Sequence, residues 1–93
     1  MNNYEMLYII DNSIDEAARE AAISKYEGVV TSSGGTVDKI DKWGMRKFAY
    51  PIKFKNDGFY VLMTFSSASD FPKEIGRQMR ISDEIVRYMI IRR

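Results

Sequence analysis

The sequence predicts an α+β domain in which two helices cover one face of a four-stranded antiparallel sheet. The hydrophobic patterns follow the order strand, helix, strand, strand, helix, strand, which is the split βαβ or ferredoxin-like arrangement. The chain has 93 residues, which suits a single domain spanning residues 1–93. Hydrophobic residues make up 45% of the chain and aromatic residues 13%, which is enough for a compact core rather than a disordered chain.

The first half of the chain predicts a strand followed by a helix. Tyr4–Ile10 is aromatic and aliphatic and becomes apolar on both faces toward its end, as in a central strand. Ser13 and Glu16 have the spacing of a capping box, in which Ser13 caps the helix and Glu16 reaches back. Gly34 and Gly35 are expected to end the helix. Its predicted apolar stripe contains Ile14, Ala18, Ala22, Tyr26, Val29 and Val30.

The middle of the chain predicts two extended segments. Thr36–Trp43 alternates imperfectly between apolar and polar residues, and a β-bulge would reconcile its period. Met45–Phe54 contains Pro51, which cannot donate a backbone hydrogen bond and therefore favours an edge strand. Asn56–Gly58 has the composition of a tight turn.

The last third of the chain predicts strand, helix and strand. Phe59–Phe65 is typical of a buried strand, and Pro72 lies in the first turn of the helix that follows. Ile85–Ile91 is β-branched and forms the last strand. Because both helices cover one face of the sheet, the opposite face is left open for a partner. The apolar stripe of the second helix contains Phe71, Ile75 and Met79.

The composition excludes several kinds of chemistry. The chain has no cysteine and no histidine, which removes disulfides, the usual zinc sites and imidazole catalysis. No set of Ser, Asp, Lys or Glu residues has the spacing of an active site, so we expect no enzyme, no metal and no cofactor. No apolar run approaches the roughly 18–20 residues that span a bilayer, and a signal-peptide pattern is lacking. These features favour a cytoplasmic protein.

The charge is distributed unevenly, although the formal net charge is only +1. Residues 1–34 hold two basic and six acidic side chains, whereas residues 35–93 hold twelve basic and seven acidic ones. Such an asymmetry can mark a polyanion-binding side of the molecule, or it can arise by chance in a chain with 29% charged residues.

Two basic clusters are candidate RNA-binding sites. Lys42–Lys55 interleaves cations with aromatic residues, and cations bind phosphates while flat rings stack on bases. The alternative is an edge strand whose lysines prevent aggregation. The second cluster consists of arginines, which suit bidentate phosphate contacts; the alternative is a helix C-terminus and a solvated strand end. These arginines are Arg77, Arg80, Arg87, Arg92 and Arg93.

The segment Gly44–Ile52, with the order Gly-Met-Arg-Lys-Phe-Ala-Tyr-Pro-Ile, closely resembles the signature of a known family. That family is the sixth protein of the bacterial small ribosomal subunit. Tyr4-Glu5 and Gly58-Phe59-Tyr60 lie at the starts of two strands as in the family, and the match runs from Tyr4 to Met89. Asn2 and Asn3 stand where many members carry basic residues, so we expect no phosphate contact there.

The resemblance implies a ferredoxin-like, non-catalytic constituent of the small ribosomal subunit. It also implies binding to the central domain of small-subunit ribosomal RNA and a heterodimer with the eighteenth small-subunit protein, and neither a membrane nor a small molecule is expected as a partner. The candidate RNA contacts are Arg46, Lys47, Arg80 and Arg87, with Arg92 and Arg93 added by charge alone. The candidate interface with the protein partner consists of Phe48, Tyr50 and Pro51.

Two rival hypotheses remain at this stage. An RNA-recognition motif has the same order of elements, but Val61 stands where that motif has an aromatic residue. Strand alternation also places Tyr8 with the core-facing residues and Glu5 on the opposite face. A hydrolase on this fold would need an arginine-bearing phosphate loop after the first strand, where this chain has Asp11-Asn12-Ser13.

Overall fold

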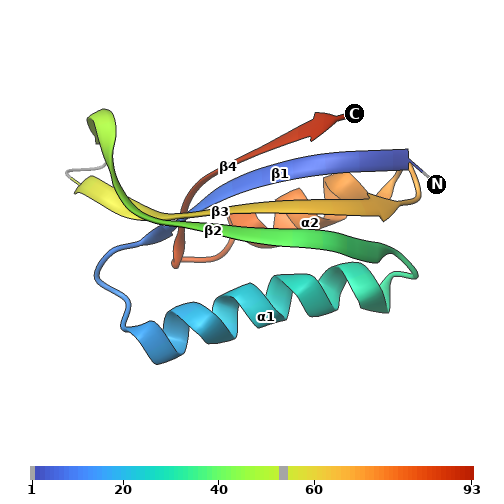
Figure 1. The fold of residues 1–93 in the computed structure, drawn as a ribbon, viewed down its shortest axis with the longest axis horizontal. Helices are drawn as coiled ribbons and strands as arrows, with labels where there is room; N and C mark the ends of the chain where they lie inside the picture. Colours follow the sequence, from blue (N-terminus) through green and yellow to red (C-terminus); the bar gives the residue numbers. More distant parts are fainter. Residues whose placement is uncertain (1, 53–54) are drawn as a thin grey trace.

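The predicted order of elements is confirmed in the structure, a computed structural model (Figure 1). It describes the backbone of residues 2–52 and 55–93 and the side chains of residues 2–45 and 58–93. The elements are β1 Asn2–Asp11, α1 Glu16–Ser32, β2 Thr36–Ile52, β3 Lys55–Ser67, α2 Phe71–Arg80 and β4 Ile85–Arg92.

The four strands form one sheet in the order β2-β3-β1-β4. Every neighbouring pair is antiparallel, and β1 lies between β3 and β4. Figure 1 shows α1 running alongside the sheet and α2 behind it, with the two chain termini at the same end of the molecule. The predicted ferredoxin-like class is therefore confirmed, with β2 and β4 as the two edge strands.

Alternate residues of the two central strands build the core. In β1 the buried set includes Tyr4, Met6 and Tyr8, so the predicted inward position of Tyr8 is confirmed. Burial raises the pKa of the Tyr8 hydroxyl well above its usual range, with the nearby Tyr26 adding to the effect. Fully burying an apolar side chain stabilises the fold by about 1.5–3 kcal/mol, so this layer dominates the folding energy. The other core residues are Ile10, Ala22, Ile23, Tyr26, Val30, Phe59, Val61, Met63, Phe65, Phe71, Ile75, Met79 and Ile85.

The start of α1 differs from the prediction. Its N-cap is Asp15, whose Oδ1 accepts a 2.8 Å hydrogen bond from the backbone N–H of Ala18. The predicted capping box at Ser13 is wrong, because Glu16 is then the first helical residue and cannot reach back to a cap three positions earlier. The backbone N–H of Ser13 instead donates to Oδ1 of Asp11.

The buried stripe of α1 also differs in part. Ala18 is exposed, and Ile23 takes a buried place that the predicted stripe left out. At the other end Gly34 has a φ of +91°, a left-handed conformation that glycine adopts readily just beyond a helix. The helix ends at Ser32 and Ser33 is its C-cap, so the predicted end at Gly34 and Gly35 is confirmed.

The two extended segments of the middle region form one long edge strand, β2. Its register against β3 shifts between Val37 and Lys39 and again between Lys42 and Gly44, which confirms the predicted bulge. The predicted turn at Asn56–Gly58 is wrong, because these residues lie inside β3, where Asp57 and Gly58 pair with β2. The ladder continues as far as Ile52 opposite Lys55. Turn-forming composition was therefore overridden by strand pairing.

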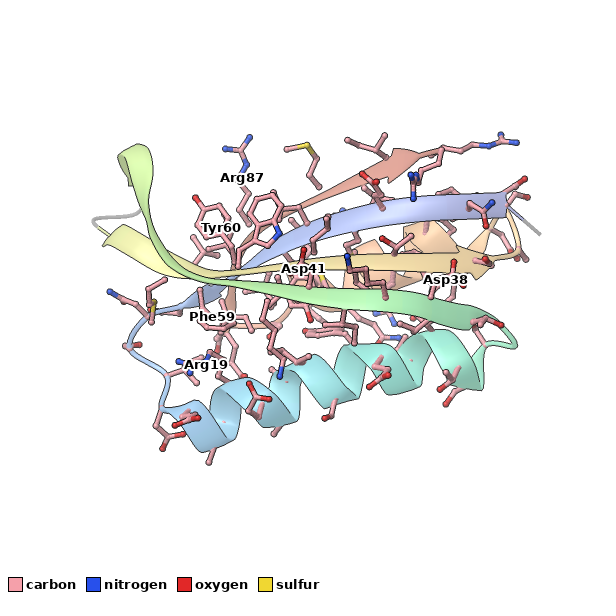
Figure 2. All side chains as sticks on the ribbon, viewed as in Figure 1. Arg19, Asp38, Asp41, Phe59, Tyr60 and Arg87 are labelled. Atoms are coloured by element: carbon pink, nitrogen blue, oxygen red, sulfur yellow. The ribbon has the colours of Figure 1, made fainter. Side chains whose placement is uncertain are left out.

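Two contacts tie α1 to the sheet. The guanidinium of Arg19 lies 4.2 Å from the centre of the Phe59 ring, a cation–π contact visible in Figure 2. Nζ of Lys42 lies 2.6 Å from Oε1 of Glu20. In the described part of the chain, no helix has the length and apolar character needed to cross a membrane.

The close approach of Gly35 to β3 gives a stability prediction. A Cβ at this position would lie 2.6 Å from the carbonyl oxygen of Ser66 and 3.1 Å from Val30. We expect Gly35→Ala to destabilise the fold by about 1–3 kcal/mol, since the backbone must move. Chemical denaturation followed by circular dichroism measures this.

Gly28→Ala is the matched control. A Cβ there would meet nothing within 4 Å, and Gly28 lies inside α1. This substitution should stabilise the fold by about 0.5–1 kcal/mol because alanine favours helix. Equal effects at the two glycines would contradict the packing described for Gly35.

Candidate nucleic-acid interface

The register of β4 against β1 decides where its arginines lie. Arg87 pairs with Ile9 and Met89 pairs with Leu7, so both belong to the open face of the sheet, away from the helices. Tyr88 and Ile90, which alternate with Arg87 and Met89 along the strand, pack against the core on the helix side. Figure 2 shows Arg87 and Tyr60 on the side of the sheet opposite α1. Neighbouring residues of β4 thus serve different surfaces.

An open groove of about 640 Å³ runs between α2 and β4, and we call it the α2–β4 groove. Arg80 at the end of α2 and Arg92 at the end of β4 both line it. These two candidate RNA contacts therefore border the same groove, although they are twelve positions apart in the sequence. Lys73 and Tyr88 line the same groove.

Arg87 lies on a different surface from Arg80. It borders a smaller hollow of about 190 Å³ on the open face, together with Leu7, Ile9 and Tyr60. Sequence proximity suggested one arginine cluster, whereas the sheet separates the helix-side pair from Arg87. Arg80 and Arg87 nevertheless flank the same edge strand, β4, from its two faces.

The two terminal arginines have partners. Nη2 of Arg92 donates a 3.1 Å hydrogen bond to Oδ1 of Asn2, and Nε of Arg93 lies 3.3 Å from Oε1 of Glu5. Glu5 lies on the face opposite the core, as its position in the strand predicted, and is half-buried there. Its pairing with Arg93 gives Glu5 a structural role at the sheet end.

The candidate residues of β2 are placed only by their backbone. Arg46 is opposite Gly58 and Lys47 is opposite Asp57 in the ladder with β3. Phe48, Tyr50 and Pro51 belong to β2, and the predicted edge-strand position of that segment is confirmed. The side chains of these five candidates lie outside the described residues.

The described part of β2 adds an aromatic pair on the open face. The rings of Trp43 and Tyr60 are stacked, with centroids 6.3 Å apart and planes inclined by 8°. Trp43 is 40% exposed. Asp38 and Asp41 lie along the same strand (Figure 2), so this part of the open face combines apolar and acidic side chains. Such a surface is less suited to a polyanion than the α2–β4 groove.

Arg77 belongs to an ion pair within α2. Its Nη2 and Nε donate to the Glu74 carboxylate at 2.8 and 3.0 Å, and Nε2 of Gln78 donates to the same carboxylate. Hydrogen bonds from Arg77 and then Gln78 lower the pKa of Glu74 to about 2. Arg77 is therefore neutralised locally, whereas Arg80 has no ion pair within the described side chains.

The sequence reasoning missed Lys73 and Tyr88 as groove residues. The available signal was spacing, because Lys73 and Arg80 are seven positions apart and so lie on one face of a helix. Tyr88 offered no such signal, since its place depends on the packing of β4 against α2.

The fold and the distribution of charge define a class of protein. It is a small ferredoxin-like α+β sandwich with an open sheet face and a cation-lined groove beside one edge strand. Both surfaces are broad and exposed, as suits contact with a macromolecule rather than enclosure of a small substrate.

Comparison with known proteins identifies the family. The family model for ribosomal protein S6 matches residues 3–92. The small ribosomal subunit protein bS6 of Clostridium novyi (strain NT) is 45% identical over 91 residues, covering 98% of this chain and 96% of that protein. The protein of the same name from Alkaliphilus oremlandii (strain OhILAs) is 42% identical over 92 residues, covering 99% and 97%.

A solved structure agrees with these relatives. The crystal structure of 30S ribosomal protein S6 from Thermotoga maritima superposes with a TM-score of 0.94 at 32% sequence identity. The match covers 99% of this chain and 87% of that one. The chain belongs to the ribosomal protein S6 family. It is accordingly a structural, non-enzymatic protein of the small ribosomal subunit in the cytoplasm, as the resemblance implied.

The Glu74–Arg77 pair gives a titration prediction. Because the pKa of Glu74 is lowered in the folded chain, the pair stabilises the fold above about pH 4.5, and this contribution is lost as the pH falls toward 2. We expect Arg77→Ala to return the Glu74 pKa most of the way toward 4.5, with Gln78 retaining part of the shift. Carboxyl NMR titration measures this. An unchanged Glu74 pKa in the variant would contradict the assignment to Arg77.

Proposed function

We propose that this chain binds the central domain of small-subunit ribosomal RNA together with the eighteenth small-subunit protein. The observation that carries the proposal is the pair Arg80 and Arg87, which flank the edge strand β4 in a member of the ribosomal protein S6 family. Both are exposed, and neither has an ion-pair partner within the described side chains. Unpaired arginines are available for bidentate contacts with phosphates.

The RNA contacts in this proposal surround β4. Arg80 and Arg92 approach from the helix side, and Arg87 and Arg93 from the open face. A strand at the sheet edge can be reached from both faces, so one RNA segment could contact all four. Arg46 and Lys47 are included through the family resemblance and their charge.

The protein contact is proposed for the opposite edge of the sheet. Phe48, Tyr50 and Pro51 lie further along β2 than Trp43 and Met45. The side chains of Trp43 and Met45 are 40% and 49% exposed. Large exposed apolar side chains on an edge strand are typical of a protein interface. The arginines around β4 and the protein contact at β2 would then lie at opposite edges of the sheet, which allows RNA and protein to bind at once.

A binding assay tests the proposal as a whole. The isolated chain should hold a central-domain RNA fragment weakly, because its net charge is only +1, and more tightly when the eighteenth protein is present. A pull-down on the RNA with and without that protein measures this, and sedimentation of the chain with small subunits is the parallel readout. A chain that stays in the soluble pool and binds neither RNA nor protein would overturn the proposal.

Substitution of the two flanking arginines tests their role. Arg80→Ala and Arg87→Ala should each weaken RNA binding and lower the slope of log affinity against log salt by about one unit. Lys39→Ala is the matched control, since it removes the same charge from an exposed position of β2, away from β4. If the salt slopes of both variants equal that of the unmodified chain, Arg80 and Arg87 do not contact phosphates and serve only the fold.

A further inference from the structure

The α2–β4 groove is a concave surface lined by cations. Its lining includes Lys73, Arg80 and Arg92 and no acidic side chain. Lys73 and Arg80 have no ion pair within the described residues, and Arg92 donates only to the neutral Asn2. Lys73 and Arg80 also border a neighbouring hollow that contains Asp70 and Glu74, and there Arg77 and Gln78 bind the Glu74 carboxylate. The groove therefore presents a net positive charge.

The spacing of these cations suits an extended ligand. Lys73 and Arg80 lie on one face of α2 and are separated by about 10 Å along its axis, from a rise of about 1.5 Å per residue. Arg92, at the end of β4, lines the same groove. A compact anion would be held by converging cations, whereas these are distributed along the groove. A chain of phosphates meets such a row one after another.

Gly76 and Tyr88 form the floor of the groove. A Cβ at position 76 would lie 3.1 Å from Oη and 3.2 Å from Cε2 of Tyr88, so the glycine lets the tyrosine lie directly against α2. No hydrogen bond engages the Tyr88 hydroxyl within the described residues, and it lies between Lys73 and Arg80 along the helix face. A phenolic hydroxyl there can donate to a phosphate or ribose oxygen.

We propose that the α2–β4 groove holds a length of the sugar–phosphate backbone of ribosomal RNA, with Lys73 and Tyr88 as contacts additional to the arginines. This inference rests on the proposed RNA-binding function and assigns a path for one strand. The open face is less suitable for that strand because it mixes cations with carboxylates: Glu5 pairs with Arg93, and Asp38 and Asp41 lie beside Lys39 along β2. Charge complementarity therefore selects the groove.

The test uses the chain with the eighteenth protein and the central-domain RNA fragment. Lys73→Ala should weaken binding several-fold and lower the salt slope by about one unit, and Lys73→Glu should weaken it further. Tyr88→Phe should cost about two- to tenfold in affinity with the slope unchanged, since a neutral hydrogen bond is lost. Lys39→Ala, an exposed lysine of β2, is the matched control and should leave the slope as it was. Circular dichroism confirms that each variant is folded.

The outcomes separate this inference from the proposed function. If Lys73→Ala and Tyr88→Phe bind like the unmodified chain while Arg80→Ala does not, the groove path is wrong and RNA binding stands. If the unmodified complex fails to bind the RNA, both fail. Binding of an oligoglutamate peptide that depends on Lys73, with RNA binding untouched by the substitution, would assign the groove to an acidic protein segment and overturn the inference.

Discussion

The pairing of β4 with β1 is the constraint on which the functional surfaces depend. The ladder runs from Tyr4 opposite Arg92 to Ile9 opposite Arg87, and shifts before Ile10 pairs with Ile85. Because successive residues of a strand point to opposite faces, this register places Arg87 on the open face while Tyr88 packs toward the helices. A slip by one residue would bury the first and expose the second. Burial of the β1 core residues at the centre of the sheet therefore fixes the placement of charge at its edge.

The contact between α2 and β4 then shapes the groove. Gly76 allows Tyr88 to lie against the helix, and the same helix face carries Lys73 and Arg80 at its two ends. Two adjoining faces of α2 have different roles. The apolar residues Phe71, Ile75 and Met79 face the core, and the neighbouring face forms the wall of the groove. The helix and the strand that carry these cations are already packed together before binding. Less order therefore has to be gained when a ligand binds, which reduces the entropic cost of association.

The two edges of the sheet differ in character. At β4, exposed arginines flank the strand from both faces, whereas β2 exposes Trp43 and Met45 beside the segment that continues to Pro51. Acidic residues along β2 further separate the two surfaces. This division is consistent with a structural protein of the small ribosomal subunit, which bridges its neighbours and performs no reaction.

The sequence alone determined the fold class, the family and most of the core, because period-two and helical patterns and the Gly44–Ile52 signature depend only on the order of residues. It was wrong about the Ser13 cap and the Asn56–Gly58 turn, where Asp15 and the long β2–β3 ladder prevailed. Only the tertiary structure decided that Arg80 and Arg92 share a groove while Arg87 lies across the sheet. It also decided that Lys73 and Tyr88 belong to that groove. The physical reason is that strand register and helix packing depend on the burial of side chains from the whole chain. No single segment of the sequence contains that information.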